Sequence, residues 1–352
     1  MKKLVAPIVA AAMSLALAGW STTPSRPAAH VGKKYTIDFI FTGYMYPYFA
    51  PMAQAVKQAA AYYPNLSIKI IAANNSGSEE SSEIDEAVAS GVNGIILNPV
   101  DGAVTSAAQQ AMNDHIPVIT IDRDVDSKSA RIAFIGDNDV KLGEIQTQYA
   151  LKYLAAKHIR TPWKVVILQG TLGSSTAIDR LRGEMNALRP YIRDHKVQLV
   201  LNQSANFATN TAEQVMSEFL AKDPHINLVL AGNDAMALGA ITAIQDQHLP
   251  LGKTVFVAGA DAQPQDLEDI IHGTQLDDVT HAPFVEAYWA VEAMANYLEY
   301  HITPPTHFKN GDVVIPMTLV TKANVSQIHA WGTPNVIPPL PYGKSSAHRV
   351  HL

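Results

Sequence analysis

Short runs of apolar, mostly β-branched residues alternate with longer Ala-rich amphipathic segments along almost the whole chain from Lys34 onward. This alternation is typical of βαβ units, in which helices connect the strands of a parallel sheet. The pattern predicts strands over residues 36–41, 67–72, 94–98, 117–122, 131–135, 163–169, 197–202, 226–232 and 254–260. It predicts helices over residues 48–62, 79–90, 102–114, 139–157, 176–189, 209–221, 234–247, 264–272 and 283–300. The expected fold class is therefore α/β.

The strands fall into two groups of about five, and the second group begins at Trp163. A chain of 352 residues is also long for one compact core, since domains commonly span roughly 100 to 200 residues. We therefore expect two Rossmann-like lobes with parallel sheets and a change of lobe near residues 136–140. After Val325 the sequence has no periodicity, which predicts that residues 326–352 form a loosely packed or disordered C-terminal extension.

The N-terminus has the features of an export signal. Lys2 and Lys3 precede a short apolar run, and Ala16-Leu17-Ala18 matches an A-x-A cleavage site. We expect residues 1–18 to be a cleaved signal peptide and residues 19–34 a disordered leader. An uncleaved membrane anchor is the alternative, which the shortness of the apolar run disfavours. Trp20 stands where a lipoprotein would carry its Cys, so no lipid anchor is expected.

The composition excludes several classes of function. The chain has no Cys, which excludes disulfides, thiolate catalysis and iron–sulfur clusters. A formal net charge of −6 and the lack of a basic stripe argue against nucleic-acid binding. Asp122, Asp124 and Asp126 have EF-hand spacing, but Ser127 and Ala133 replace the turn Gly and the bidentate Glu. We expect no metal and no cofactor.

Gly and a polar or charged residue follow most of the expected strands at their carboxyl ends. An open α/β sheet binds its ligands in the crevice outside those ends. The pair Asp122-Arg123, which closes the strand PVITID, is therefore expected to face a cleft. Helix capping is the alternative for several other strand-end residues, since Asn and Asp are favoured as caps. Those residues are Asp101, Asp137, Asn138 and Asp234.

Five stretches occur in an order that indicates a family: PVITIDRD, LQGTLGSSTAIDRLRGE, ANF at 205–207, GNDAMALGAITAIQ and VAGAD at 257–261. Over residues 35–325 the chain resembles the periplasmic sugar-binding proteins of bacterial ABC importers, in the ribose-binding-like branch, and LQGTLGSSTAIDR is similar to the galactofuranose-binding member. The resemblance implies a type I periplasmic binding protein, a Venus-flytrap fold with a three-crossing hinge. It implies an N-terminal lobe of residues 35–136 plus 282–314 and a C-terminal lobe of residues 137–281 plus 315–325.

The resemblance also implies a set of ligand-binding residues. The family's paired Asp-Arg falls on Asp122 and Arg123, and its second-lobe arginine falls on Arg180. Its stacking aromatic falls on Phe207, its amide on Asn233 and its carboxylate on Asp261. The loop after the first strand supplies Thr42, Tyr46, Tyr48 and Phe49. Two positions depart from the family pattern, because Tyr46 replaces an expected Asn and His281 replaces a hinge Gln. Core packing is the alternative for Phe207 and for at least one of the loop aromatics, and an ordinary hinge histidine is the alternative for His281.

These residues suit a sugar, whose hydroxyls lie around its edge and whose C–H faces are apolar. Arg123 and Arg180 balance Asp122 and Asp261 in charge, which favours a neutral monosaccharide or polyol over a sugar acid or phosphate. We expect a monomeric, non-catalytic periplasmic protein that delivers its ligand to an inner-membrane ABC permease, which the first helices of both lobes would contact. A sensor that presents its ligand state to a chemoreceptor or histidine kinase is the alternative.

An exported enzyme that uses Asp122 and Asp261 as a carboxylate pair is a third hypothesis. The neighbouring arginines should keep both groups ionised and leave no proton donor, so we expect no enzymatic activity. Repressors that share this fold carry an N-terminal helix-turn-helix where this chain has its export signal, so no nucleic acid is expected as a partner.

Overall fold

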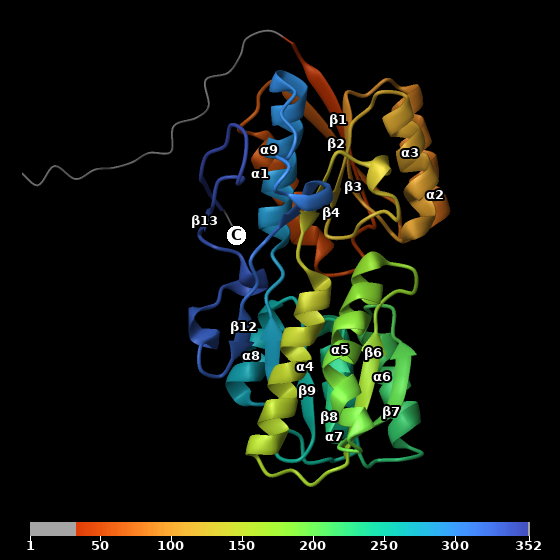
Figure 1. Ribbon diagram of the computed structural model, residues 1–352, viewed down its shortest axis with the longest axis vertical. Coiled ribbons are helices and arrows are strands. Elements are labelled where there is room, and N and C mark those ends of the chain that lie inside the picture. The colour runs from red at the N-terminus through yellow and green to blue at the C-terminus, as the bar shows by residue number, and fades with distance from the viewer. Residues whose placement is uncertain (1–32, 351–352) are drawn as a thin grey trace, which may run out of the picture.

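The computed structural model describes residues 33–350, which form two lobes stacked along the long axis of the molecule (Figure 1). Each lobe is built on a six-stranded sheet. The strand order is β11-β5-β4-β3-β1-β2 in the first lobe and β12-β10-β9-β8-β6-β7 in the second. All neighbouring strands are parallel except β10 and β12. The expected α/β fold is confirmed. The predicted signal peptide and residues 19–32 of the predicted leader lie outside the described residues.

All the expected strands and helices form, with ends shifted by a few residues. The strands are β1 (Tyr35–Phe41), β2 (Leu66–Ala72), β3 (Gly94–Asn98), β4 (Val118–Ile121), β5 (Ala133–Gly136), β6 (Trp163–Gln169), β7 (Val197–Ser204), β8 (Leu228–Ala231) and β9 (Phe256–Ala258). The helices are α1 (Phe49–Ala60), α2 (Gly77–Ala89), α3 (Thr105–Asn113), α4 (Asp139–Ala156), α5 (Ser175–Arg193), α6 (Thr209–Leu220), α7 (Asp234–Asp246), α8 (Pro264–His272) and α9 (Pro283–Tyr300).

Sequence periodicity missed the short strands, which are β10 (Asp277–Val279), β11 (Asp312–Val314), β12 (Leu319–Thr321), β13 (Val336–Ile337) and β14 (His348–Arg349). Each has only two or three residues, too few for an alternating pattern. Three of them, β10, β11 and β12, lie next to the points where the chain crosses between the lobes. The chain passes from one sheet to the other after β5, after β10, and between β11 and β12.

The structure shows which strand-end residues cap the following helix and which do not. Asp101 accepts a hydrogen bond from the backbone N–H of Ala103 (2.8 Å), and Asn138 caps α4 through the N–H of Lys141 (3.0 Å). Capping is therefore confirmed for these two. Asn233, which precedes Asp234, is the residue that caps α7. Asp137 and Asp234 do not cap the helices that follow them, and both carboxylates are buried.

The C-terminal extension is not loosely packed, contrary to the expectation. Residues 326–350 run from the second lobe back along α9 and α1 of the first, where β13 and β14 form an antiparallel pair (Figure 1, dark blue). Ile337, Leu340 and Tyr342 are buried against the first-lobe core. The prediction failed because these apolar side chains are spaced irregularly, so each packs without creating a periodic pattern.

Helices α4 and α5 touch backbone to backbone, and this contact places the arginine of the second lobe. Gly143 faces the carbonyl oxygen of Arg180, and Gly183 faces the carbonyl oxygen of Val140. A side-chain carbon at either glycine would collide with the opposite main chain. The close approach fixes the position of α5, and therefore of Arg180, relative to α4.

We predict that Gly183→Ala lowers the free energy of unfolding by about 1–3 kcal/mol, because a rigid backbone faces the added methyl group. Urea denaturation followed by circular dichroism measures this change. Gly77→Ala is the matched control, since the nearest atom to a methyl group there is a side-chain oxygen of Asp101 at an ordinary 3.4 Å. Equal stability of the two variants would contradict the proposed helix contact.

Candidate ligand-binding site

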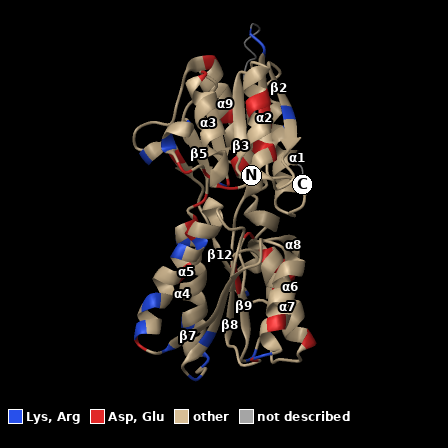
Figure 2. Ribbon diagram, turned by 90° about the vertical axis from the view of Figure 1, so that its right-hand side faces the viewer, with Lys and Arg blue, Asp and Glu red and all other residues tan. Residues whose placement is uncertain are grey.

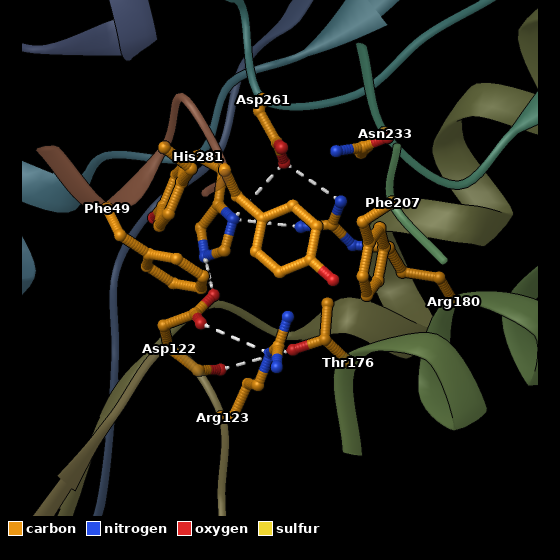
Figure 3. Close-up of a pocket in the computed structure, with 11 residues that line it drawn as sticks. Phe49, Asp122, Arg123, Thr176, Arg180, Phe207, Asn233, Asp261 and His281 are labelled. Atoms are coloured by element: carbon orange, nitrogen blue, oxygen red, sulfur yellow. Dashed lines mark hydrogen bonds and ion pairs between the residues drawn. The ribbon is translucent and has the colours of Figure 1, made fainter. Parts of the chain in front are cut away.

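A cavity lies between the two lobes at the carboxyl ends of their strands (Figure 3). The empty space within it is about 300 Å³ when the open solvent at its mouth is included. Its lining comes from both lobes and comprises Tyr46, Tyr48, Phe49, Asp122, Arg123, Thr176, Arg180, Phe207, Asn233, Asp261 and His281. All but one of the expected ligand-binding residues therefore meet in one place. Their ligand-binding role remains a prediction.

Thr42 is the expected residue that does not line the cavity. Its side chain is fully buried, and its hydroxyl lies 3.4 Å from the carbonyl oxygen of Asn98. Arg123 reaches Thr42 from the cavity side, with 3.5 Å between Nη1 and Oγ1, and donates from Nη1 to the carbonyl oxygen of Val100 (2.9 Å). Thr42 thus supports Arg123 from behind. Thr176 lines the cavity from the first turn of α5 and was missed, because no strand-end pattern marks it.

Arg123 lies between two aromatic rings, one from each lobe. Its guanidinium carbon is 5.3 Å from the centre of the Phe49 ring and 5.4 Å from that of Phe207, which are cation–π distances. Phe207 has a left-handed backbone (φ 55°), and its ring lies so close to Gly170 that a side chain there would collide with it. The ring faces the cavity, so Phe207 is not only a core residue.

Arg180 is the centre of the second-lobe half of the cavity and is only 2% exposed. Nε donates to Oδ1 of Asp139 (2.7 Å), and Nη1 donates to Oδ1 of Asp261 (2.8 Å) and to the carbonyl oxygen of Gly232 (2.7 Å). Nη2 lies 2.8 Å from Nδ1 of His281. Burial alone would lower the pKa of Arg180, but the carboxylates of Asp261 and Asp139 hold it well above its usual value.

His281 joins the two halves of the cavity at the hinge. Nε2 lies 3.0 Å from Oε1 of Glu286, and Nδ1 lies 3.3 Å from Oδ1 of Asp261. The ring stacks on Tyr48 with 4.8 Å between centroids, and the Tyr48 hydroxyl donates to Oε2 of Glu286 (3.1 Å). Burial would lower the pKa of His281, but the surrounding carboxylates, Asp137 first among them, raise it well above its usual value.

Acidic side chains gather at the junction between the lobes, which Figure 2 shows as red segments. Around the cavity they outnumber the basic ones and comprise Asp122, Asp137, Asp139, Asp261 and Glu286. Burial raises the pKa of Asp137 to about 7 and that of Glu286 to about 8. Burial is the cause of both pKa shifts, and the positive charge of His281 acts in the opposite direction. The sequence count of two charges of each sign was therefore incomplete, because Asp137, Asp139, Glu286 and His281 also lie around the cavity.

Asp122, His281 and Glu286 are the one group within residues 33–350 whose ligand atoms lie close enough together to hold a metal ion. Their partners argue against this use. Oδ2 of Asp122 accepts from Asn98 Nδ2 (2.7 Å) and lies 3.7 Å from Nε of Arg123, while His281 faces Glu286 and Asp261. The group is a closed network of ion pairs, which would have to be broken before an ion could bind.

A family model described as "Periplasmic binding protein domain" matches residues 37–301. This chain belongs to the periplasmic binding protein family. The match confirms the expectation of a binding protein rather than an enzyme. The ribose import binding protein of Bacillus subtilis is 30% identical over 302 residues, which cover 85% of this chain and 94% of that protein. The galactofuranose-binding protein of Escherichia coli is 27% identical over 62% of this chain and 68% of its own length.

Solved structures of periplasmic binding proteins agree with this assignment. A solute-binding protein from Bacillus halodurans, with bound myo-inositol, superposes with a TM-score of 0.75 at 26% identity and covers 84% of this chain and 97% of that chain. A galactofuranose-binding protein has a TM-score of 0.76 at 25% identity and covers 83% of this chain and 96% of that chain. Within residues 33–350, none of the helices has the length and apolar character to cross a membrane.

The lobes of this periplasmic binding protein are closed upon each other. The N–H of Asp124 donates to Oγ of Ser175 (2.8 Å), and the Thr176 hydroxyl donates to the carbonyl oxygen of Asp122 (3.4 Å). The N–H of Gly102 donates to the carbonyl oxygen of Gly173 (3.3 Å). Each of these bonds joins the first lobe to the second, so they form only in the closed arrangement.

We predict that the free energy of unfolding falls as the pH rises from about 5.5 to 8.5. Burial raises the pKa of Glu80, Glu184 and Glu286 to about 8, so the folded state holds protons that the unfolded state releases near pH 4. The contribution of these three groups to stability is therefore fully present below about pH 4 and is lost as the pH rises toward 8. The expected loss is about 1.4 kcal/mol for each pH unit and each such group. His281 acts in the same direction, because its pKa is also raised in the fold.

Urea denaturation at several pH values measures this slope. Glu184→Gln should flatten it by roughly 1.4 kcal/mol per pH unit, because one such proton is removed. Glu268→Gln changes an exposed glutamate and serves as the matched control. A slope that is the same in both variants would show that Glu184 titrates as an exposed group does.

Proposed function

We propose that this periplasmic binding protein captures one neutral monosaccharide or polyol between its lobes and delivers it to the permease of an ABC importer. The observation that carries the proposal is the composition of the interlobe cavity. Two aromatic rings, two arginines and two carboxylates from opposite lobes line one cavity, and small-molecule sites commonly combine apolar walls with a few convergent polar groups. The named relatives are import and binding proteins, which favours import over sensing.

The side chains match the two kinds of surface that a sugar presents. Phe49 and Phe207 offer flat apolar faces to its C–H groups. Arg123 and Arg180 offer several donors to hydroxyl oxygens, and Asp261 accepts from hydroxyl groups. The side-chain oxygen of Asn233 is already used to cap α7, through the N–H of Met236 (3.0 Å), so its amide nitrogen is the group that remains for a ligand.

A ligand held by both lobes stabilises the closed form selectively, and the permease reads that form. Exposed apolar side chains of both lobes suit such a partner. Tyr44 (57% exposed) and Met45 (63%) lie in the loop before α1, and Leu172 (66%) and Ile178 (51%) lie before and within α5. The predicted signal peptide, residues 1–18, would place the protein in the periplasm, where we propose that it acts as a monomer.

The first experiment identifies the ligand. We expect native mass spectrometry of the purified protein, followed by calorimetry with D-ribose, L-arabinose, D-galactose and myo-inositol, to find a neutral ligand with a Kd of micromolar or below, which corresponds to about −8 kcal/mol. The same panel includes ribose 5-phosphate and galacturonate as charged competitors. Preference for a charged sugar, or binding to none of the neutral ones, would contradict the proposed function.

We predict that Arg123→Met raises the Kd for that ligand roughly 10- to 100-fold, since a hydrogen bond to a charged group contributes about 1.5–3 kcal/mol. Met keeps much of the volume between the two rings but has no donors. Arg182→Met is the matched control, because Arg182 is exposed and pairs only locally with Asp179. Arg123 is preferable to Arg180, whose removal would leave Asp139 and Asp261 buried without their main partner. An unchanged Kd would place the sugar away from Arg123.

A further inference from the structure

The C-terminal segment 326–350, here called the strap, makes a fourth connection between the lobes. At its start, Val325 packs with Ala262 and Leu267 in a cluster of the second lobe. The segment then passes the hinge and lies along α9 of the first lobe (Figure 1). It lies beyond the residues 37–301 that the family model matches. The strap is therefore an addition to the three crossings between the sheets.

The strap is firmly bound to the first lobe through buried polar groups of α9. Oε2 of Glu292 accepts from the Ser345 hydroxyl (2.7 Å), and Oε1 lies 2.7 Å from Nε2 of His348. Asn296 donates to the carbonyl oxygen of Lys344 (3.0 Å) and accepts from its N–H (2.7 Å). Glu292 and Asn296 are fully or almost fully buried, and the strap supplies most of their hydrogen-bond partners.

Trp331 is a strap residue that contacts a side chain of the cavity wall. Its N–H donates to the carbonyl oxygen of Ala262 (2.6 Å), the residue after Asp261 on the second lobe. Its side chain meets the Tyr48 ring of the first lobe edge to face, with 5.6 Å between centroids and 80° between planes. The backbone of Trp331 is left-handed (φ 60°), an uncommon conformation for a bulky residue, so the surrounding contacts impose it.

We propose that Trp331 is a positioning residue of the ligand cavity, which holds the Tyr48 ring against His281 and ties it to the second lobe. The proposal rests on the cavity being the ligand site and goes beyond it, because Trp331 does not line the cavity itself. Tyr48 packs against three rings: it stacks on His281 and meets Phe49 and Trp331 edge to face. Without Trp331 the tyrosine ring gains space to tilt, which weakens its stacking on His281.

The two contacts of Trp331 belong to different lobes. Its main chain is bonded to Ala262 of the second lobe, whereas its ring packs on Tyr48 of the first. Opening the lobes has to separate the ring from Tyr48 or the main chain from Ala262. The contact therefore stabilises the closed form and should act on the rate of ligand release rather than on the rate of association.

The test compares Trp331→Leu and Trp331→Phe in the full chain, with whichever of D-ribose, L-arabinose, D-galactose and myo-inositol binds the wild type. Leu fills much of the volume without a ring, and Phe restores an aromatic edge. We expect Leu to raise the Kd about tenfold, or about 1.4 kcal/mol, chiefly through faster dissociation in stopped-flow measurements. The Kd of Trp331→Phe should stay within about threefold of the wild-type Kd, because Phe keeps an aromatic pair with Tyr48 and such a pair contributes on the order of 0.5–1.5 kcal/mol.

Trp289→Phe is the matched control. It removes the hydrogen bond from the indole to the carbonyl oxygen of Pro338 in the middle of the strap and leaves Trp331 in place. Its Kd should equal that of the wild type, and thermal unfolding should show all variants folded. If the wild type binds and Trp331→Leu releases the sugar at the wild-type rate, this inference is wrong and the proposed function stands. If the wild type binds none of the four sugars, both fall.

Discussion

The pairing of buried charges fixes the geometry of this binding protein around its cavity. Arg180 is almost completely removed from water, and a buried guanidinium is tolerated only when its donors are satisfied. Its partners come from the start of α4, the residue after β8, the loop after β9 and the second residue after β10. These four chain segments must converge on one side chain whether or not a ligand is present. The second-lobe half of the site is therefore preformed, and little binding energy is lost in ordering it.

The same charges explain why a neutral ligand suits the cavity. Arg123 lies 3.7 Å from Asp122, Arg180 pairs with Asp139 and Asp261, and His281 faces Asp261 and Glu286. A charged ligand would compete with these pairs in a place where water cannot compensate. A sugar brings only hydroxyls, which join the network as donors and acceptors. The direct hydrogen bonds between the lobes contribute about 0.5–1.5 kcal/mol each, so the ligand decides how stable the closed form is.

Sequence patterns located the parts of the site that follow from the architecture. Asp122 and Arg123 were found because parallel strands end at one edge of a sheet, and the family resemblance supplied Phe207, Asn233, Asp261 and His281. The patterns could not find Asp139 and Glu286, which lie in the first turns of α4 and α9, where an acidic residue is ordinary. Only the fold shows that both first turns point at Arg180 and His281. Thr42 was assigned to the cavity because ribose-like family members keep a hydroxyl at this place in the loop. Its hydroxyl is instead turned toward the main chain behind Arg123.

The strap raises the question of how a tethered hinge opens. Gly332 lies so close to Thr280 that a side chain there would collide with it, and Thr280 precedes His281 in the crossing after β10. The strap therefore runs beside the hinge rather than across the mouth of the cleft. A segment close to the axis of rotation moves less than the rims of the cleft when the lobes separate, so both ends of the strap can stay attached while one of the two contacts of Trp331 breaks. The strap therefore makes the hinge stiffer. Through Trp331 it also restrains Tyr48, which lines the cavity.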